Sequence, residues 1–190
     1  SGDMSWVAVD GYTAATMLGI SAQDGYASMP EAYSWSNAFF GLVPGSIGET
    51  STIAILLGLA ILLVTKIASY RIVGGVILGT VVTSYFFNLV GSDTNPMFQM
   101  PFWWHMVMGG YAFGLVFMAT EPVSGSHTNA GRWIYGFVIG FMVIMIRVLN
   151  PAYPEGMMLA ILFGNLLSPL IDHFVVSRNI SYRNKVLNAK

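Results

Sequence analysis

Two acidic side chains border uncharged stretches of this sequence and are its best candidates for chemistry. Asp172 directly follows the uncharged run 156–171, and Glu121 ends another such run. Ionisable groups in or beside apolar spans are costly to bury, so they are functional candidates by default. Carboxylates are hard oxygen ligands of the kind that sodium prefers, which makes both residues candidates for a sodium pathway. The alternative is a carboxylate at a helix end in the headgroup region, which for Asp172 includes pairing with His173 or Arg178.

The remaining polar residues give no pattern typical of a soluble enzyme. No nucleophile elbow, P-loop, dinucleotide fingerprint or HExxH motif occurs. Three histidines are scattered without metal-ligand spacing: His105, His127 and His173. His105 fits a packed or interfacial side chain better than a ligand. We expect Arg147 and Glu155 to form a structural pair, and Glu49 to cap a helix N-terminus, where a carboxylate meets the positive end of the helix dipole. No catalytic acid, base or nucleophile is assigned.

Composition identifies the environment in which these residues act. Of the 190 residues, 55% are hydrophobic and only 9% are charged, whereas soluble domains carry about a quarter charged residues. This composition excludes an ordinary soluble globule, and it excludes a disordered chain, which needs low hydrophobicity. The net charge of -1 offers no basic surface for nucleic acid, and the absence of cysteine excludes disulfides and thiolate chemistry within the chain. The sequence therefore predicts an all-α integral membrane protein.

Charged residues divide the chain into five predicted membrane-spanning helices. Crossing a bilayer takes about 20 mainly apolar residues, and the runs that approach this length are 50–65, 72–92, 94–120, 133–146 and 156–171. Two prolines place the start of the third helix near Phe102. Small residues four apart let helices approach closely in lipid, and they occur at Gly75 and Gly79, Gly110 and Gly114, Gly136 and Gly140, and Ala160 and Gly164. These pairs favour a compact bundle, although glycine is common in membrane helices generally.

The basic residues predict the orientation of these helices. Lysine and arginine gather in cytoplasmic loops, and here they lie between the first two spans, between the third and fourth, and after the fifth: Lys66, Arg71, Arg132, Arg178, Arg183, Lys185 and Lys190. The C-terminus is then cytoplasmic. We predict a non-cytoplasmic segment 1–49 with an interfacial half-helix at 35–43, a five-helix bundle over 50–177 and a cytoplasmic tail over 178–190.

The N-terminal segment carries a motif that resembles one of a known family. Read by physics alone, Thr13 and Thr16 suit a helix cap and a first-turn residue. However, the segment DGYTAAT at residues 10–16 resembles a flavinylation motif in which the last threonine, here Thr16, is esterified by the phosphate of FMN. Ala14 departs from the glycine that the family usually has. Further segments resemble the B subunits of the sodium-translocating NADH:quinone oxidoreductase, at residues 44–49, 91–95, 150–162 and 169–173.

This resemblance implies a fold and a function. The family subunit has ten membrane helices in two inverted halves, like the urea transporters, and this chain resembles its C-terminal half. The resemblance implies a flavin-carrying membrane subunit of a respiratory sodium pump, which relays electrons from NADH through covalent FMN on Thr16, and through riboflavin, toward ubiquinone. Sodium export is coupled to that relay, and Asp172 and Glu121 match acidic positions linked to sodium. A half chain alone is expected to be inactive.

The implied partners are the other subunits of the complex, ubiquinone, the flavin transferase and the lipid bilayer, without nucleic acid. The implied location is the bacterial inner membrane, with residues 1–49 outside, where the transferase acts. Three alternatives stay open at this point. In these alternatives the chain is an RnfD-type subunit of a ferredoxin:NAD oxidoreductase, half of a channel or transporter without redox chemistry, or a structural membrane anchor for other subunits.

Overall fold

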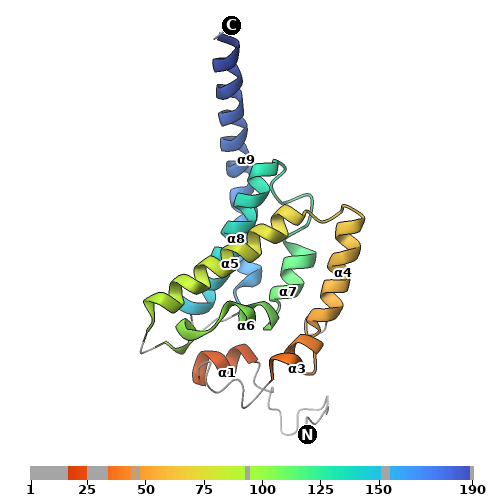
Figure 1. The fold of residues 1–190 in the computed structure, drawn as a ribbon, viewed down its shortest axis with the longest axis vertical. Coiled ribbons are helices and arrows are strands. Elements are labelled where there is room, and N and C mark those ends of the chain that lie inside the picture. Colours follow the sequence, from red (N-terminus) through yellow and green to blue (C-terminus); the bar gives the residue numbers. More distant parts are fainter. Residues whose placement is uncertain are drawn as a thin grey trace.

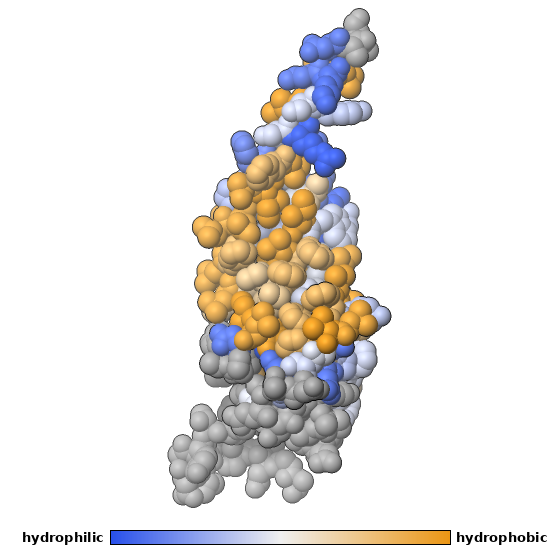
Figure 2. Space-filling model, turned by 90° about the vertical axis from the view of Figure 1, so that its left-hand side faces the viewer, coloured by the Kyte–Doolittle hydropathy of each residue, from blue (hydrophilic) through white to orange (hydrophobic). Residues whose placement is uncertain are grey.

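The computed structural model describes residues 17–24, 34–43, 45, 48–92, 95–150 and 155–188, and these ranges contain helices and no β-strand. Three helices are long and apolar enough to cross a membrane (Figure 1): α5 Tyr70–Val90, α8 Asn129–Leu149 and α9 Met157–Asn188. A shorter apolar helix, α4 Thr52–Val64, has 13 residues. Figure 2 shows a broad hydrophobic band on one face of the molecule, as expected for a surface in contact with lipid. The predicted all-α membrane fold is confirmed.

The third predicted span differs from expectation, because it is an interrupted helix. The expected continuous helix from Phe102 ends at Val107 and gives α6 Phe102–Val107. The chain resumes helical structure as α7 Tyr111–Phe113 and the π-helical turn η4 Gly114–Met118. Between them Gly109 has a φ of +60°, a left-handed conformation that glycine adopts at little cost. The break in this helix falls at the Gly109–Gly110 pair.

Close packing of α5 on α8 is the main helix contact, and the small residues predicted to mediate it do so. A Cβ atom on Gly75 would lie 2.7 Å from the Trp133 carbonyl oxygen, and one on Gly136 would lie 2.5 Å from the Ile72 carbonyl oxygen. Backbone therefore meets backbone at this crossing, with no room for a side chain on either glycine. In lipid, such close approach replaces the hydrophobic drive for helix association.

The second helix contact joins α8 to α9, and α9 extends beyond the bundle. A Cβ on Gly164 would lie 2.7 Å from Ile139, which is fully buried together with Tyr135 and Val143. Beyond this contact α9 continues to Asn188 and projects past the other helices (Figure 1). The segment that follows the predicted fifth span is thus helical as far as Asn188.

Two short helices cover the opposite end of the bundle (Figure 1): α1 Met17–Asp24 and α3 Trp35–Phe40. The helix expected near 35–43 is present and ends at Gly41, which has a φ of +86°. Met17 and Leu18 of α1 are buried in a core cluster with Met108 and Trp104. The N-terminal end of α1 is therefore fixed against the interrupted helix.

One capping expectation is wrong. The residue that caps α4 is Ser51, whose hydroxyl accepts a hydrogen bond from the Ala54 backbone N–H at 3.4 Å. A serine directly before the first helical residue reaches that N–H more easily than Glu49, which stands two positions earlier. The carboxylate of Glu49 lies instead beside Gly110, where a Cβ atom would approach its Oε2 to 2.7 Å.

Candidate functional site

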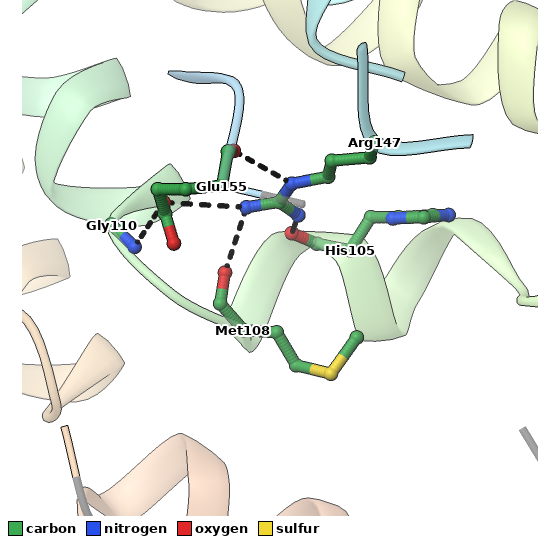
Figure 3. A network of polar contacts seen from close by, with 5 residues as sticks. All are labelled: His105, Met108, Gly110, Arg147 and Glu155. Atoms are coloured by element: carbon green, nitrogen blue, oxygen red, sulfur yellow. Dashed lines mark hydrogen bonds and ion pairs between the residues drawn. The ribbon is translucent and has the colours of Figure 1, made fainter. Parts of the chain in front are cut away.

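Arg147 forms the centre of a buried polar site at the interruption between α6 and α7, which we call the break site (Figure 3). Its guanidinium comes from the last turn of α8 and is completely buried. Nη1 donates to the His105 carbonyl oxygen at 2.7 Å, Nη2 to the Met108 carbonyl oxygen at 3.0 Å, and Nε to the Glu155 carbonyl oxygen at 3.1 Å. Because α6 ends here, two of these carbonyls lack a partner within a helix. Arg147 supplies it.

Glu155 completes the break site with the opposite charge. Its Oε1 lies 3.8 Å from Nη2 of Arg147 and accepts a hydrogen bond from the Gly110 backbone N–H at 2.7 Å. A cation thus meets the C-terminal end of α6, and an anion meets the start of α7, which is the favourable arrangement for both helix dipoles. The predicted structural pair of Arg147 and Glu155 is confirmed. The hydrogen bonds from Arg147 to backbone carbonyls were not predicted.

The glycines of the break allow these groups to approach. A Cβ atom on Gly109 would overlap the Glu155 carboxylate and lie 2.5 Å from a methyl group of Leu18 in α1. The break site therefore contacts α1 directly, through Leu18. Two carboxylates, those of Glu49 and Glu155, lie near Gly110, so the acids of the site outnumber its guanidinium.

Aromatic and polar side chains surround the guanidinium further. The Arg147 guanidinium carbon lies 5.6 Å from the centre of the Tyr111 ring, within the range of a cation–π contact. The Tyr111 hydroxyl lies 2.8 Å from the Thr80 hydroxyl on α5. The imidazole of His105 points away from the guanidinium (Figure 3), is buried as expected for a packed side chain, and has no hydrogen-bond partner in the described part of the chain.

Asp172 forms a second polar site at the other end of the bundle. Its Oδ1 accepts hydrogen bonds from the hydroxyls of Ser126 and Thr128, both at 2.6 Å, and from the Thr128 backbone N–H at 3.1 Å. Its Oδ2 accepts from the His127 backbone N–H at 2.8 Å. Residues 126–128 directly precede α8, so the carboxylate also lies near the positive end of that helix. Asp172 therefore ties α9 to the start of α8.

Glu121 lies at the beginning of the same connection. Its Oε2 accepts from the hydroxyl and the backbone N–H of Ser124, at 2.5 and 2.8 Å, and its Oε1 accepts from the Val123 backbone N–H at 3.0 Å. The hydrogen bond from the Ser124 hydroxyl, with the two backbone hydrogen bonds, lowers the pKa of Glu121 below its ordinary value. Each carboxylate thus binds donors of the loop between η4 and α8.

Two of the three predicted site residues bind the same loop, without a contact between them in the described residues. Glu121 lies at the beginning of this loop and Asp172 contacts its end, and both carboxylates accept hydrogen bonds from donors of the loop. Thr16 lies outside the described residues, and α1 begins at the next residue, Met17. Within the described ranges, no three histidine or acidic side chains gather as a metal site.

The break site is the part that sequence reasoning missed. The signals for it were a Gly109–Gly110 pair inside an apolar run and an arginine at the end of another span. Neither signal identifies the other as its partner, because 42 residues separate His105 from Arg147.

Together these features define an all-α integral membrane protein whose third apolar run is an interrupted helix closed by a buried arginine and its partly exposed glutamate partner. Irregular backbone of this kind is tolerated at membrane depth only where protein surrounds it. The chain belongs to the NQR2, RnfD, RnfE family, whose model matches residues 1–181.

Named relatives are similar over almost the whole chain. It is 63% identical over 184 residues to a protein of Azotobacter vinelandii, covering 96% of this chain and 46% of the relative. It is 58% identical over 185 residues to a protein of Chromohalobacter salexigens, covering 97% of this chain and 45% of the relative. Both relatives are named as the B subunit of a Na(+)-translocating NADH-quinone reductase. The chain spans about half the length of these relatives.

Proposed function

We propose that this chain is the C-terminal half of the flavin-carrying membrane subunit of a respiratory sodium pump. The observation that carries the proposal is 63% identity over 96% of the chain to a relative named as the B subunit of a sodium-translocating NADH-quinone reductase. In this function the chain works with the other subunits of that complex in a bacterial inner membrane. It passes electrons that originate from NADH toward ubiquinone, coupled to sodium export.

FMN is proposed to be attached to Thr16 through a phosphoester. When bound, FMN supplies reversible electron uptake, while the protein supplies position and electrostatics. What supports an attachment here is the motif at 10–16 together with the anchoring of α1, whose first residues Met17 and Leu18 are buried beside Met108. An attachment point next to a fixed helix end restricts where the flavin ring can travel. Riboflavin is proposed to bind between this half and the rest of the full-length protein.

Sodium is the proposed cargo, and Asp172 and Glu121 are proposed to border its path at the cytoplasmic end. Supporting this assignment, both carboxylates act on the single loop between η4 and α8. Asp172 accepts four hydrogen bonds, two of them from hydroxyl groups. Carboxylates engaged in this way favour a role in shaping and charging the entrance over a role as a full coordination shell, which needs several further oxygens.

Denaturing mass spectrometry of the full-length subunit, produced with its flavin transferase, tests the proposal. The wild type should carry an added mass equal to FMN less one water, which is the balance for forming the ester. The Thr16→Ala variant should lack it, and Thr50→Ala, which changes a threonine outside the motif at 10–16, should retain it. An unmodified wild type, or a Thr16→Ala variant that keeps the added mass, would contradict the flavin assignment.

A further inference from the structure

The break site has the composition of a monovalent-cation site. Three backbone carbonyl oxygens, from His105, Met108 and Glu155, surround the position of the Arg147 guanidinium, each accepting from a different nitrogen, and a Glu155 carboxylate oxygen lies 3.8 Å from Nη2. In transporters with interrupted helices, unwound carbonyls and the C-terminal ends of half-helices are the groups that hold sodium. Here the position is filled by a side chain of the same protein, the guanidinium of Arg147 (Figure 3).

The charge around this position favours a cation strongly. The carboxylates of Glu49 and Glu155 both lie near Gly110, the C-terminal end of α6 adds partial negative charge, and the Tyr111 ring presents its face to the guanidinium. Full burial of Arg147 reduces the screening by water that weakens these attractions, although the side chain of Glu155 is 34% exposed. Without the guanidinium, the site would keep its carbonyls and its acids and lack a counter-charge.

We propose that the interrupted helix forms a cation site, and that the guanidinium of Arg147 occupies it as a cation tethered to the protein. The guanidinium thereby excludes free sodium from the break. The break is thereby kept closed to ions, so the sodium path of the proposed function runs elsewhere in the protein. The claim that sodium is the ion kept out of the break rests on the proposed function. The occupancy of the site by a tethered cation rests on the contacts of Arg147 alone.

Chemical rescue tests the occupancy directly in the full-length subunit. Arg147→Ala should lower the Tm by roughly 10 °C, because it leaves three backbone carbonyls without their donor and the partly exposed Glu155 carboxylate without its counter-charge. Millimolar guanidinium should restore at least half of the loss. Urea at the same concentration should not, because it is planar and has N–H donors but carries no charge. Arg132→Ala is the matched control, since Arg132 also donates to a carbonyl, that of Ser126, but is partly exposed. Its Tm should not respond to guanidinium.

A second pair of variants keeps the test decisive if Arg147→Ala does not fold. Arg147→Lys keeps a cation, and Arg147→Gln keeps N–H donors without charge, so the lysine variant should retain the higher Tm. Equal Tm values for the two variants would overturn the proposal. Rescue by urea as effective as rescue by guanidinium would overturn it as well, and so would the absence of any rescue.

The sodium part is tested by comparing sodium chloride with choline chloride at equal ionic strength. The gain in Tm from sodium over choline should be larger in Arg147→Ala than in the wild type, because only the variant opens the break to a free cation. An equal gain in both proteins overturns the exclusion of sodium. Failure of the proposed function gives a different result, namely a wild type without FMN on Thr16 that still shows the guanidinium rescue in Arg147→Ala.

Discussion

At the scale of single residues, three charged side chains of the described part of the chain bind backbone groups that helices leave unpaired. Arg147 satisfies the end of α6, Glu155 binds the start of α7, and Asp172 binds the residues before α8. In lipid, an unpaired backbone group costs several kcal/mol, because water cannot replace its partner. These three charges therefore stabilise the places where the backbone is irregular.

Asp172 provides a prediction at this scale. Asp172→Ala removes four accepted hydrogen bonds, and we expect it to cost about 1–3 kcal/mol of stability. Asp172→Asn keeps one acceptor oxygen and should lose less. Thermal unfolding of the full-length subunit measures both losses of stability, with Asn179→Ala as the control on an exposed position of the same helix.

In the assembled complex, the Asp172→Ala variant should also need more sodium for half-maximal quinone reduction. An unchanged sodium dependence would argue against Asp172 on the path.

At the scale of helices, the sequence predicts what depends on neighbours along the chain. Uncharged runs predict α5, α8 and α9, because the run of α5 matches the thickness of the bilayer and the runs of α8 and α9 approach it, and the short separation of Arg147 and Glu155 predicts their pair. The interruption at Gly109 and the partners of Asp172 depend on residues more than 40 positions away. Hydropathy cannot reveal them, because glycine inside an apolar run is equally compatible with an unbroken membrane helix.

The crossing of α5 and α8 gives the prediction for this scale. A Cβ on Gly140 would overlap the Val76 carbonyl oxygen, whereas one on Gly74 would meet only the outer atoms of the Trp133 ring, at 2.9 Å. Gly140→Ala should therefore push the helices apart and cost about 1–3 kcal/mol, while Gly74→Ala should have a small effect because a side chain can move. Thermal unfolding of the two variants in one detergent makes the comparison. Equal losses of stability in the two variants would mean that the contact between Gly140 and the α5 backbone does not limit how closely the helices pack.

At the scale of the whole molecule, the ends of the bundle differ in charge. The connection between α4 and α5, which carries Lys66, and the first turn of α8, which carries Arg132, lie at the end from which α9 projects, and α1 and α3 lie at the other end (Figure 1). The positive-inside rule assigns the first of these ends to the cytoplasm. The chain contains no cysteine, so single cysteines can report on each end without background from this half.

Labelling of a cysteine-free full-length subunit measures this orientation. A maleimide that cannot cross membranes should label the Ser36→Cys variant in cells whose inner membrane is intact. It should label Ser181→Cys only after that membrane is permeabilised. Both serines are exposed, in α3 and α9 respectively. The reverse pattern would invert the topology, and would place Thr16 on the side opposite to the one that the flavin assignment requires.

The cap on α6 also determines an order of events during biosynthesis. His105 and Met108 leave the ribosome well before Arg147, which follows His105 by 42 positions. Until α8 has entered the bilayer, the nascent segment around Gly109 therefore has carbonyls without their native partner. The translocon has to deliver this segment before the residue that closes it is available. We therefore expect the third apolar run to reach its native packing only after α8 and the glutamate that follows it have been made.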